Sequence, residues 1–298
     1  MFDSQLDAGA QAFLRQSYAN AWEQYITSLT TATANRAAWD VCVITASNAQ
    51  QASAYEAQLE ARRTAGIIPP QTDFVVLADP EGMRIGSGGA TLRALQELHQ
   101  RHAIADRRIL LVHSGGDSRR LPHCSAQGKL FARVPHEWPD GRPSCLFDEV
   151  LVTLSGLPAR IPPGVLIMSG DVLLLFDPLQ LVLHRQGISG VATAVSAATA
   201  GHHGVYVTEP GSRRVQSFLH KPTMDRMTAA GALRPNGSAL VDTGMVWFDA
   251  SAVDRFLTLA REMERAIGEG LTINLYGDLL APLAESTSRA DYLTDDSD

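Results

Sequence analysis

The residues best placed to do chemistry in this chain lie in one segment, residues 113–129, with the sequence HSGGDSRRLPHCSAQGK. An apolar run at 109–112 precedes it and predicts a β-strand that enters a glycine turn. Paired glycines lack a Cβ, so the main chain can turn tightly and point successive amide groups at one phosphate. Arginines would add planar forks of donors, and a lysine would add a movable point charge. We therefore predict a site for nucleotide phosphates, built from Gly115, Gly116, Arg119, Arg120 and Lys129.

Three further charged residues stand beside predicted strands, where open α/β sheets bind their ligands. Asp171 follows the apolar run 165–168 after a Ser-Gly step, and its carboxylate would hold a divalent cation against phosphates. Lys221 ends another strand in HKPT, and Asp242 in VDTGMVWF suits a second metal ligand. Simpler interpretations stay open: an aspartate can cap a turn, a lysine is commonly a solvated charge, and a basic glycine turn need not bind a ligand.

A second glycine-rich turn precedes the basic segment, with Gly86, Gly88 and Gly89 followed by a helical pattern. These glycines would approach a base or ribose, or they would serve only tight packing of a helix on a strand. The turn also raises the alternative of a dinucleotide-binding oxidoreductase. That alternative is disfavoured, because GSGGAT lacks the GxGxxG spacing and no acidic residue closes a following strand at the expected distance.

The elements that must position these residues follow a regular pattern from Trp39 onward. Strands are expected at residues 41–45, 74–77, 109–112, 165–168, 190–196, 205–208, 215–219 and 241–248. Helices are expected after Asn48, after the glycines at 86–89, from Ser144, between Asp177 and Gly187, and from Ser251 and Asp254. The pattern predicts an open, mostly parallel or mixed sheet with helices on both faces. Residues 1–38 are expected to form an N-terminal helical extension packed on the main domain, residues 39–298.

Composition excludes several classes of partner. The 298 residues carry a formal net charge of −7, which argues against a general nucleic-acid or anionic-membrane surface. The three cysteines form no CxxC pair, and no apolar run approaches the length of a membrane span. The N-terminus lacks a cationic start followed by an apolar core, so we expect a cytoplasmic protein. The oligomeric state is left open.

Together these residues resemble the sugar nucleotidyltransferases. The loop pattern of that family, GGxGTRLxPxTxxxPK, is matched by Gly115, Gly116, Arg120, Leu121 and Lys129. Its metal aspartate is matched by Asp171, its EKP lysine by Lys221, and its NTG or DTG turn by Asp242, Thr243 and Gly244. This chain departs from the pattern at four places. Ser118 and Arg119 replace Gly-Thr, Gly128 replaces the proline before the lysine, and the spacing from the arginine to the lysine is one residue shorter. His220 replaces a glutamate that contacts the sugar.

Five stretches narrow the resemblance to the fucose-1-phosphate guanylyltransferase family, which occurs alone or as the N-terminal part of a bifunctional fucokinase/GDP-fucose pyrophosphorylase. They are GSGGATLRAL, HSGGDSRRLP, MSGDVLLLF, VDTGMVWF and INLYGDLL, and the similarity runs from about Trp39 to Tyr292. The resemblance implies a GT-A-like, Rossmann-type fold and an enzyme that converts GTP and fucose 1-phosphate into GDP-fucose and pyrophosphate.

The resemblance also implies roles for individual residues. Arg120 and Lys129 would contact the triphosphate, and Lys221 would contact the sugar phosphate, as the catalytic set. Asp171 and Asp242 would hold Mg²⁺ or Mn²⁺. Nucleotide-binding residues would be Gly86, Gly88, Gly89, Gly115, Gly116, Asp117, Ser118, Arg119 and Gly170, and sugar-binding residues would be His220, Thr243 and Gly244.

Two alternatives to this function remain open. The chain could act on another sugar 1-phosphate, since a loop that recognises a triphosphate says nothing about the sugar. It could also be a binding or regulatory domain that lacks the rest of a longer enzyme, because family members usually continue into a β-helical segment and sometimes a kinase.

Overall fold

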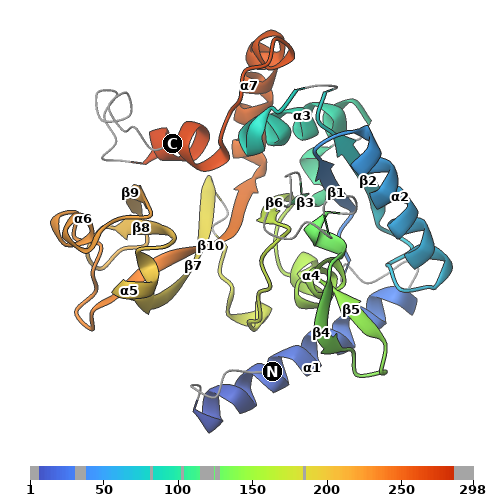
Figure 1. Cartoon of the computed structure of the whole chain (residues 1–298), viewed down its shortest axis with the longest axis horizontal. Coiled ribbons are helices and arrows are strands. Elements are labelled where there is room, and N and C mark those ends of the chain that lie inside the picture. Colours follow the sequence, from blue (N-terminus) through green and yellow to red (C-terminus); the bar gives the residue numbers. More distant parts are fainter. Residues whose placement is uncertain are drawn as a thin grey trace.

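The computed structural model describes residues 7–30, 38–80, 83–101, 104–114, 124, 128–183 and 186–284. Their main feature is an eight-stranded sheet in the order β2-β1-β3-β6-β10-β8-β9, with β7 also paired to β10 (Figure 1). The strands are β1 (Val41–Ala46), β2 (Asp73–Ala78), β3 (Arg108–His113), β6 (Gly164–Ser169), β7 (Ile188–Ser196), β8 (Gly204–Thr208), β9 (Val215–His220) and β10 (Ser238–Asp249). A separate two-stranded hairpin, β4 (Arg133–Glu137) and β5 (Pro143–Cys145), was not predicted from the sequence.

The first half of the sheet is parallel and the second half is antiparallel. β2, β1, β3 and β6 all run in the same direction. β10 is antiparallel to β6, β7 and β8, and β9 is antiparallel to β8. The mixed sheet expected from the sequence is therefore confirmed, and the carboxyl ends of the four parallel strands meet at one edge.

Helices cover both faces of the parallel half, because its strands are apolar on both sides. The helices are α1 (Ala8–Thr30), α2 (Ala49–Thr64), α3 (Gly86–Arg101), α4 (Leu146–Thr153), α5 (Ala197–Ala200), α6 (Met224–Ala229) and α7 (Ala250–Gly268). In β1, Cys42 and Ile44 face one core cluster together with α2 and α4, whereas Val41 and Val43 face a second cluster with α3 and α7. A third, smaller cluster joins β8, β9 and β10 to α5 and α6.

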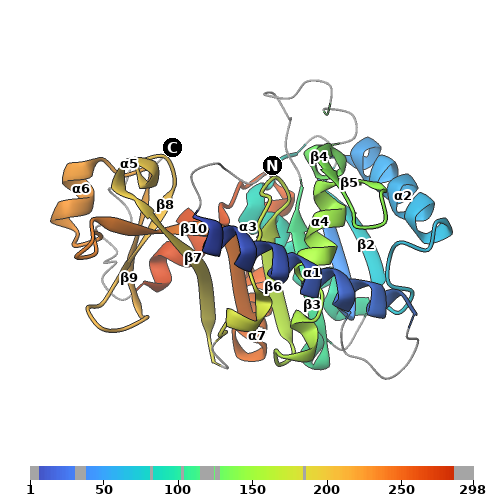
Figure 2. The ribbon, with the colours of Figure 1, turned by 90° about the horizontal axis from the view of Figure 1, so that it is seen from below.

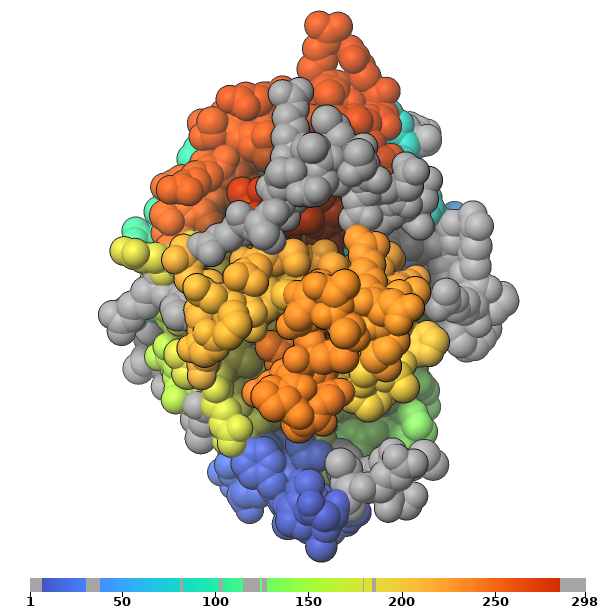
Figure 3. All heavy atoms as spheres, turned by 90° about the vertical axis from the view of Figure 1, so that its left-hand side faces the viewer, coloured from blue at the N-terminus to red at the C-terminus, as the bar shows by residue number. Residues whose placement is uncertain are grey.

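Helices α5 and α6 pack on the antiparallel half of the sheet, whereas the N-terminal helix α1 packs on α4. Figure 3 shows the gold to orange residues of β8, β9 and α6 across the middle of one side of the molecule, with α1 in blue at one end. The N-terminal helix α1 runs across α4 in Figure 2, and the Tyr25 and Trp22 rings pack on Trp138 at centroid distances of 5.4 and 5.2 Å. The predicted N-terminal helix is thus present, while the division of the chain at residue 38 stays a prediction.

Two expectations about helices need correction. Among the described residues between Asp177 and Gly187, that is 178–183 and 186, the structure has only a 3₁₀ turn, Pro178–Gln180, where a longer helix was predicted. A short helix is stabilised mainly by apolar packing along one face, and here Leu183 packs on the core while the neighbouring Val182 side chain is 67% exposed. Helix α7 begins at Ala250, earlier than expected, because the Asp249 carboxylate accepts a hydrogen bond from the amide of Ala252 at 2.8 Å and caps the helix.

A buried ion pair joins α2 to α4. Arg62 Nε lies 2.7 Å from Asp148 Oδ1, and the two side chains are only 12% and 6% exposed. The guanidinium also stacks over the Phe131 ring at 4.9 Å, and Asp148 Oδ2 accepts a hydrogen bond from the amide of Cys145. Each buried charge is therefore neutralised by the other.

We expect Arg62→Met to lower the free energy of unfolding by about 3–5 kcal/mol, because removing one partner leaves Asp148 buried without its countercharge. Arg63→Met is the matched control, since Arg63 pairs with Glu60 at the surface, where the side chains are 56% and 65% exposed. The control should cost about 1 kcal/mol or less. Urea denaturation of both variants measures the difference, and equal losses would contradict the assigned role of the buried pair.

Candidate active site

Lys129 and Asp171 form an ion pair at the carboxyl end of β6. Lys129 Nζ lies 3.2 Å from Asp171 Oδ2, and the side chains are 29% and 49% exposed. The Ser169 hydroxyl donates to Asp171 Oδ1 at 2.6 Å. Burial alone would raise the pKa of Asp171, but the Ser169 hydrogen bond and the Lys129 ammonium outweigh it and hold this pKa below its ordinary value. The structure therefore brings together an ionised carboxylate and an ammonium that are 42 residues apart in the sequence.

Gly170 makes this approach possible. Its amide donates to the carbonyl of His113 at the end of β3, at 2.8 Å. A Cβ at this position would lie 3.0 Å from that carbonyl oxygen and 3.2 Å from Leu130 Cδ1. The chain that leaves β6 therefore crosses closely over the end of β3, where the predicted phosphate-binding segment begins. Contact of Gly170 with a nucleotide stays a prediction.

The central part of the basic segment lies outside the described residues. The predicted phosphate contacts of Gly115, Gly116, Asp117, Ser118, Arg119 and Arg120 thus stay predictions. Both ends of the segment are described: Ser114 follows β3, and Gly128 precedes a 3₁₀ turn, Lys129–Phe131. Of the two arginines and the lysine in this segment, Lys129 is the one that the structure describes.

The Asp-Thr-Gly turn forms an irregularity in β10 that lies against the end of β6. The pairing of β10 with β7 shifts register between Asp242 and Met245. Gly244 has φ +77°, and a Cβ on it would lie 3.2 Å from Ser169 Cβ. The Thr243 hydroxyl donates to the carbonyl of Val191 in β7 at 2.7 Å. Two predicted site elements, the strand end that carries Asp171 and the Asp-Thr-Gly turn, are therefore neighbours.

Asp242 itself sits in an aromatic surrounding that was not predicted. Its Oδ1 accepts a hydrogen bond from the Tyr206 hydroxyl at 2.8 Å, and its Oδ2 accepts one from the amide of Gly244 at 3.0 Å. Phe218 packs between Tyr206 and Tyr276, with ring centroids 5.2 Å from each. Burial raises the pKa of Asp242 above its ordinary value despite these bonds. A cation beside this carboxylate would favour its ionised form.

His220 and Lys221 lie on the edge strand of the sheet. His220 pairs with Gly204, which is adjacent to Val205, the partner of Val241 in β10. This register places His220 two strands from the Asp-Thr-Gly turn, about 10 Å away by the usual spacing of strands. Lys221 has φ +42°, and its amide donates to the carbonyl of His203 at 3.0 Å. The structure thus places both residues level with the turn but does not show either in contact with it.

The glycines at 86–89 begin helix α3 and pack on a distant segment. The amides of Gly88 and Gly89 donate to the carbonyl of Ile273 at 2.8 and 3.2 Å. Gly86 has φ +72°, and a Cβ on it would lie 2.3 Å from the same oxygen. These two amides already have an acceptor, so a nucleotide contact at this turn would use other groups. That contact stays a prediction.

His113 at the end of β3 links the two glycine-rich segments, a role that the sequence did not indicate. Its Nε2 lies 2.9 Å from Thr91 Oγ1, whose hydroxyl donates to the carbonyl of Ser87. Nε2 is therefore the protonated nitrogen, and Nδ1 faces Thr45 Oγ1 at 3.3 Å. Burial lowers the pKa of His113 to about 4, so the ring is neutral at neutral pH. Nothing in the local sequence around Thr45 or Thr91 indicates that these residues contact His113.

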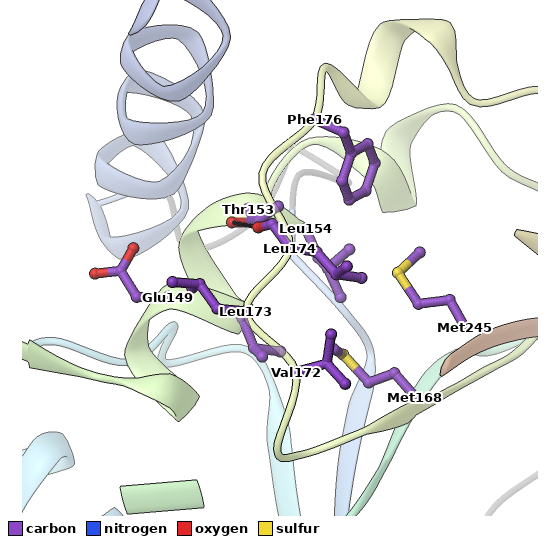
Figure 4. A pocket seen from close by; sticks show the side chains of 10 residues that line it. Glu149, Thr153, Leu154, Met168, Val172, Leu173, Leu174, Phe176 and Met245 are labelled. Carbon is purple, nitrogen blue, oxygen red and sulfur yellow. Dashed lines mark hydrogen bonds between the residues drawn. The ribbon is translucent and has the colours of Figure 1, made fainter. Parts of the chain in front are cut away.

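A small apolar cavity lies behind the strand end that carries Asp171. Its lining includes Met168, Val172, Leu174, Phe176 and Met245, and in Figure 4 the Glu149 carboxylate points away from these side chains. Its volume of about 10 Å³ suits one water molecule and is far too small for a nucleotide. A nucleotide would therefore not bind inside this cavity.

A divalent cation fits the described residues only with help from a substrate. Among the residues that the structure describes, no three His, Cys, Asp or Glu side chains gather as a metal cluster. Asp171 is ionised and half-exposed, which suits Mg²⁺, an ion commonly held by one or two carboxylates together with phosphate oxygens and water. Within the same described ranges, no helix has the length and apolar character needed to cross a bilayer.

Comparisons with known proteins agree with the motifs. A family model described as the fucose pyrophosphorylase domain matches residues 101–298. Bifunctional fucokinase/GDP-fucose pyrophosphorylase of Arabidopsis thaliana is 31% identical over 294 residues, which cover 86% of this chain and 28% of that protein. Fucose-1-phosphate guanylyltransferase of Mus musculus and of Homo sapiens are each 34% identical, over 63% of this chain and 34% and 33% of their own lengths.

The chain thus spans about a third or less of the length of these curated relatives. The family model covers two thirds of the chain, from the end of α3 through β3, β6 and β10, the strands on which Asp171 and the Asp-Thr-Gly turn lie. The similarity predicted from the motifs is confirmed, and the chain belongs to the fucose pyrophosphorylase domain family.

Proposed function

We propose that this chain transfers a guanylyl group from GTP to L-fucose 1-phosphate, giving GDP-L-fucose and pyrophosphate. The observation that carries the proposal is the Lys129–Asp171 pair at the carboxyl end of β6, where a cation that would bind phosphate and a carboxylate that would hold a metal ion lie side by side. Family membership supports this chemistry, and the names of the mouse and human relatives support the base and the sugar.

The reaction needs positioning and neutralisation of charge more than proton transfer. The sugar phosphate is already ionised, so it can attack the α-phosphorus in line while pyrophosphate leaves. Lys129 would bind the polyphosphate through its ammonium, which has three donors and can keep Asp171 as one partner. Asp171, together with Asp242, would hold Mg²⁺ or Mn²⁺, which offsets the charge that develops on the leaving oxygens. A cytoplasmic location stays a prediction.

The sugar would lie between the Asp-Thr-Gly turn and the edge strand β9. The Thr243 hydroxyl donates its proton to the carbonyl of Val191, so its oxygen remains an acceptor for a sugar hydroxyl. His220 is exposed, as is Lys221, whose ammonium would meet the sugar phosphate. A site built around specific hydrogen bonds rejects the wrong sugar because it leaves polar groups unpaired.

The length of the relatives favours one alternative. The chain matches only 28–34% of each of the three proteins described above, so it could be a nucleotide-binding domain that needs the remainder of a longer protein for turnover. Binding of GTP without release of pyrophosphate would be the result expected from that alternative.

We expect Lys129→Ala to lower kcat/KM by about 10- to 100-fold, because a charge-assisted contact to phosphate is lost. Lys129 and Lys221 are the two lysines of the sequence, so their acetylation by an amine-reactive reagent is easily followed by mass spectrometry. GTP with Mg²⁺ should slow the acetylation of Lys129. Wild-type turnover in Lys129→Ala, with an unchanged circular dichroism spectrum, would contradict the assignment.

For the metal, we expect Asp171→Asn to abolish turnover that depends on Mg²⁺ or Mn²⁺ and Asp242→Asn to weaken it. The change to an amide preserves shape but removes the charge that holds a hard cation. Asp254→Asn serves as a control, because Asp254 lies exposed on α7, away from this edge. If the Asp171 variant keeps a normal titration with Mg²⁺, Asp171 is not a metal ligand.

For the substrates, pyrophosphate release should be fastest with GTP and β-L-fucose 1-phosphate when nucleoside triphosphates and sugar 1-phosphates are tested in all combinations. Equal or faster release with mannose 1-phosphate, or with UTP or dTTP, would limit the proposal to nucleotidyl transfer in general.

A further inference from the structure

Tyr55 of α2 contacts both ends of the segment that carries the predicted phosphate-binding residues. Its hydroxyl oxygen lies 2.7 Å from Ser114 Oγ and 3.2 Å from the Ser114 carbonyl oxygen. At the other end, a Cβ on Gly128 would lie 1.9 Å from the same hydroxyl oxygen. Residues 115–127 connect Ser114 to Gly128, so a single side chain stands where the segment begins and where it ends.

We propose that Tyr55 is a positioning residue that holds the two ends of this segment together and so places Lys129 for binding a polyphosphate. The part of this proposal that concerns turnover rests on the proposed function. Tyr55 would act through its contacts with Ser114 and Gly128.

The Tyr55 side chain is itself firmly held. It is fully buried, and its ring packs against Phe131, which ends the 3₁₀ turn that begins at Lys129, at a centroid distance of 5.2 Å. Burial raises the pKa of the phenol, so the hydroxyl keeps its proton and can donate to the Ser114 carbonyl while it accepts from the Ser114 hydroxyl. The hydroxyl therefore has defined partners on one side of the segment.

At the other end of the segment, the close approach of Tyr55 requires a glycine at position 128. Gly128 is buried, has φ +68°, and precedes Lys129 directly. A proline, which the nucleotidyltransferase loop pattern has at this place, cannot adopt this φ, and any side chain would meet the Tyr55 hydroxyl. The contact thus explains why glycine stands before the lysine in this chain.

Ser114 ties the contact to the sheet. Its amide donates to Thr45 Oγ1 at the end of β1, at 3.2 Å. Tyr55 therefore connects Lys129 to the carboxyl ends of β1 and β3, which are fixed by parallel pairing. Loss of the hydroxyl should loosen the segment without opening the core, because the ring of a phenylalanine would keep the packing on Phe131.

The test uses Tyr55→Phe, with Tyr25→Phe as the matched control. Tyr25 is a fully buried tyrosine of the same core cluster, and its hydroxyl donates to the carbonyl of Ile67, away from the segment. Cys124, between Ser114 and Gly128, is a buried free thiol, so its rate of labelling by a thiol reagent, followed by mass spectrometry, reports on the segment without any need for turnover.

Tyr55→Phe should label Cys124 about three- to tenfold faster than wild type, the factor expected for one or two neutral hydrogen bonds. Its affinity for inorganic pyrophosphate, measured by calorimetry, and its kcat/KM for GTP should fall by a similar factor, while KM for the sugar 1-phosphate stays unchanged. Tyr25→Phe should change none of these. If Tyr55→Phe and Tyr25→Phe label alike, or if pyrophosphate affinity is unchanged, Tyr55 does not position the segment.

Gly128→Ala probes the same contact from the other side. It should lower pyrophosphate affinity more in the wild-type background than in the Tyr55→Phe background, because removing the hydroxyl relieves the shortest contact with the new methyl group and leaves the ring, whose Cζ would lie 2.8 Å away. Equal losses in both backgrounds would overturn the proposed contact. If the wild-type chain releases no pyrophosphate from any substrate pair, the proposed function fails, while thiol labelling and pyrophosphate binding still decide the role of Tyr55.

Discussion

The parallel pairing of β3 with β6 is the constraint on which the candidate site depends. His113 and Ser169 are partners at the ends of these strands, so the chain leaves both at the same edge of the sheet. The amide of Gly170 bonds to the His113 carbonyl, and Asp171 follows at once. Both strands are apolar and fully covered by helices, so neither can slide or change face without exposing its core residues. The Lys129–Asp171 pair is a consequence of that register.

The antiparallel half of the sheet is connected to the same edge through β10. β10 pairs with β6 through residues 245–249 and with β8 through residues 240 and 241, and the irregularity between these two parts holds the Asp-Thr-Gly turn. Gly244 packs on Ser169, which brings Asp242 and its aromatic neighbours toward the end of β6. The single long strand β10 therefore joins the half of the sheet that carries Lys129 and Asp171 to the half that carries His220 and Lys221.

Most of the fold was predictable because its signals are local. The eight strands of the main sheet were expected close to their observed positions, since each is an apolar run bounded by turn residues. The helix expected at 177–187 was wrong: Asp177, Pro178 and Gly187 give good start and stop signals, but the described residues after the 3₁₀ turn at Pro178–Gln180 form no helix. The β4–β5 hairpin was missed, since four of the five residues of β4 are exposed and carry no alternating pattern.

The sequence by itself determined which residues stand at strand ends, the family of the chain, and the residue types from which a phosphate and metal site would be built. Only the tertiary structure decided that Lys129 meets Asp171, that Tyr206 bonds to Asp242, that His113 joins the two glycine-rich segments, and that Tyr55 stands at both ends of the basic segment. The physical reason is that contacts of this kind follow from strand order, register and close packing between residues dozens of positions apart. Local spacing in a single sequence contains no record of those distances.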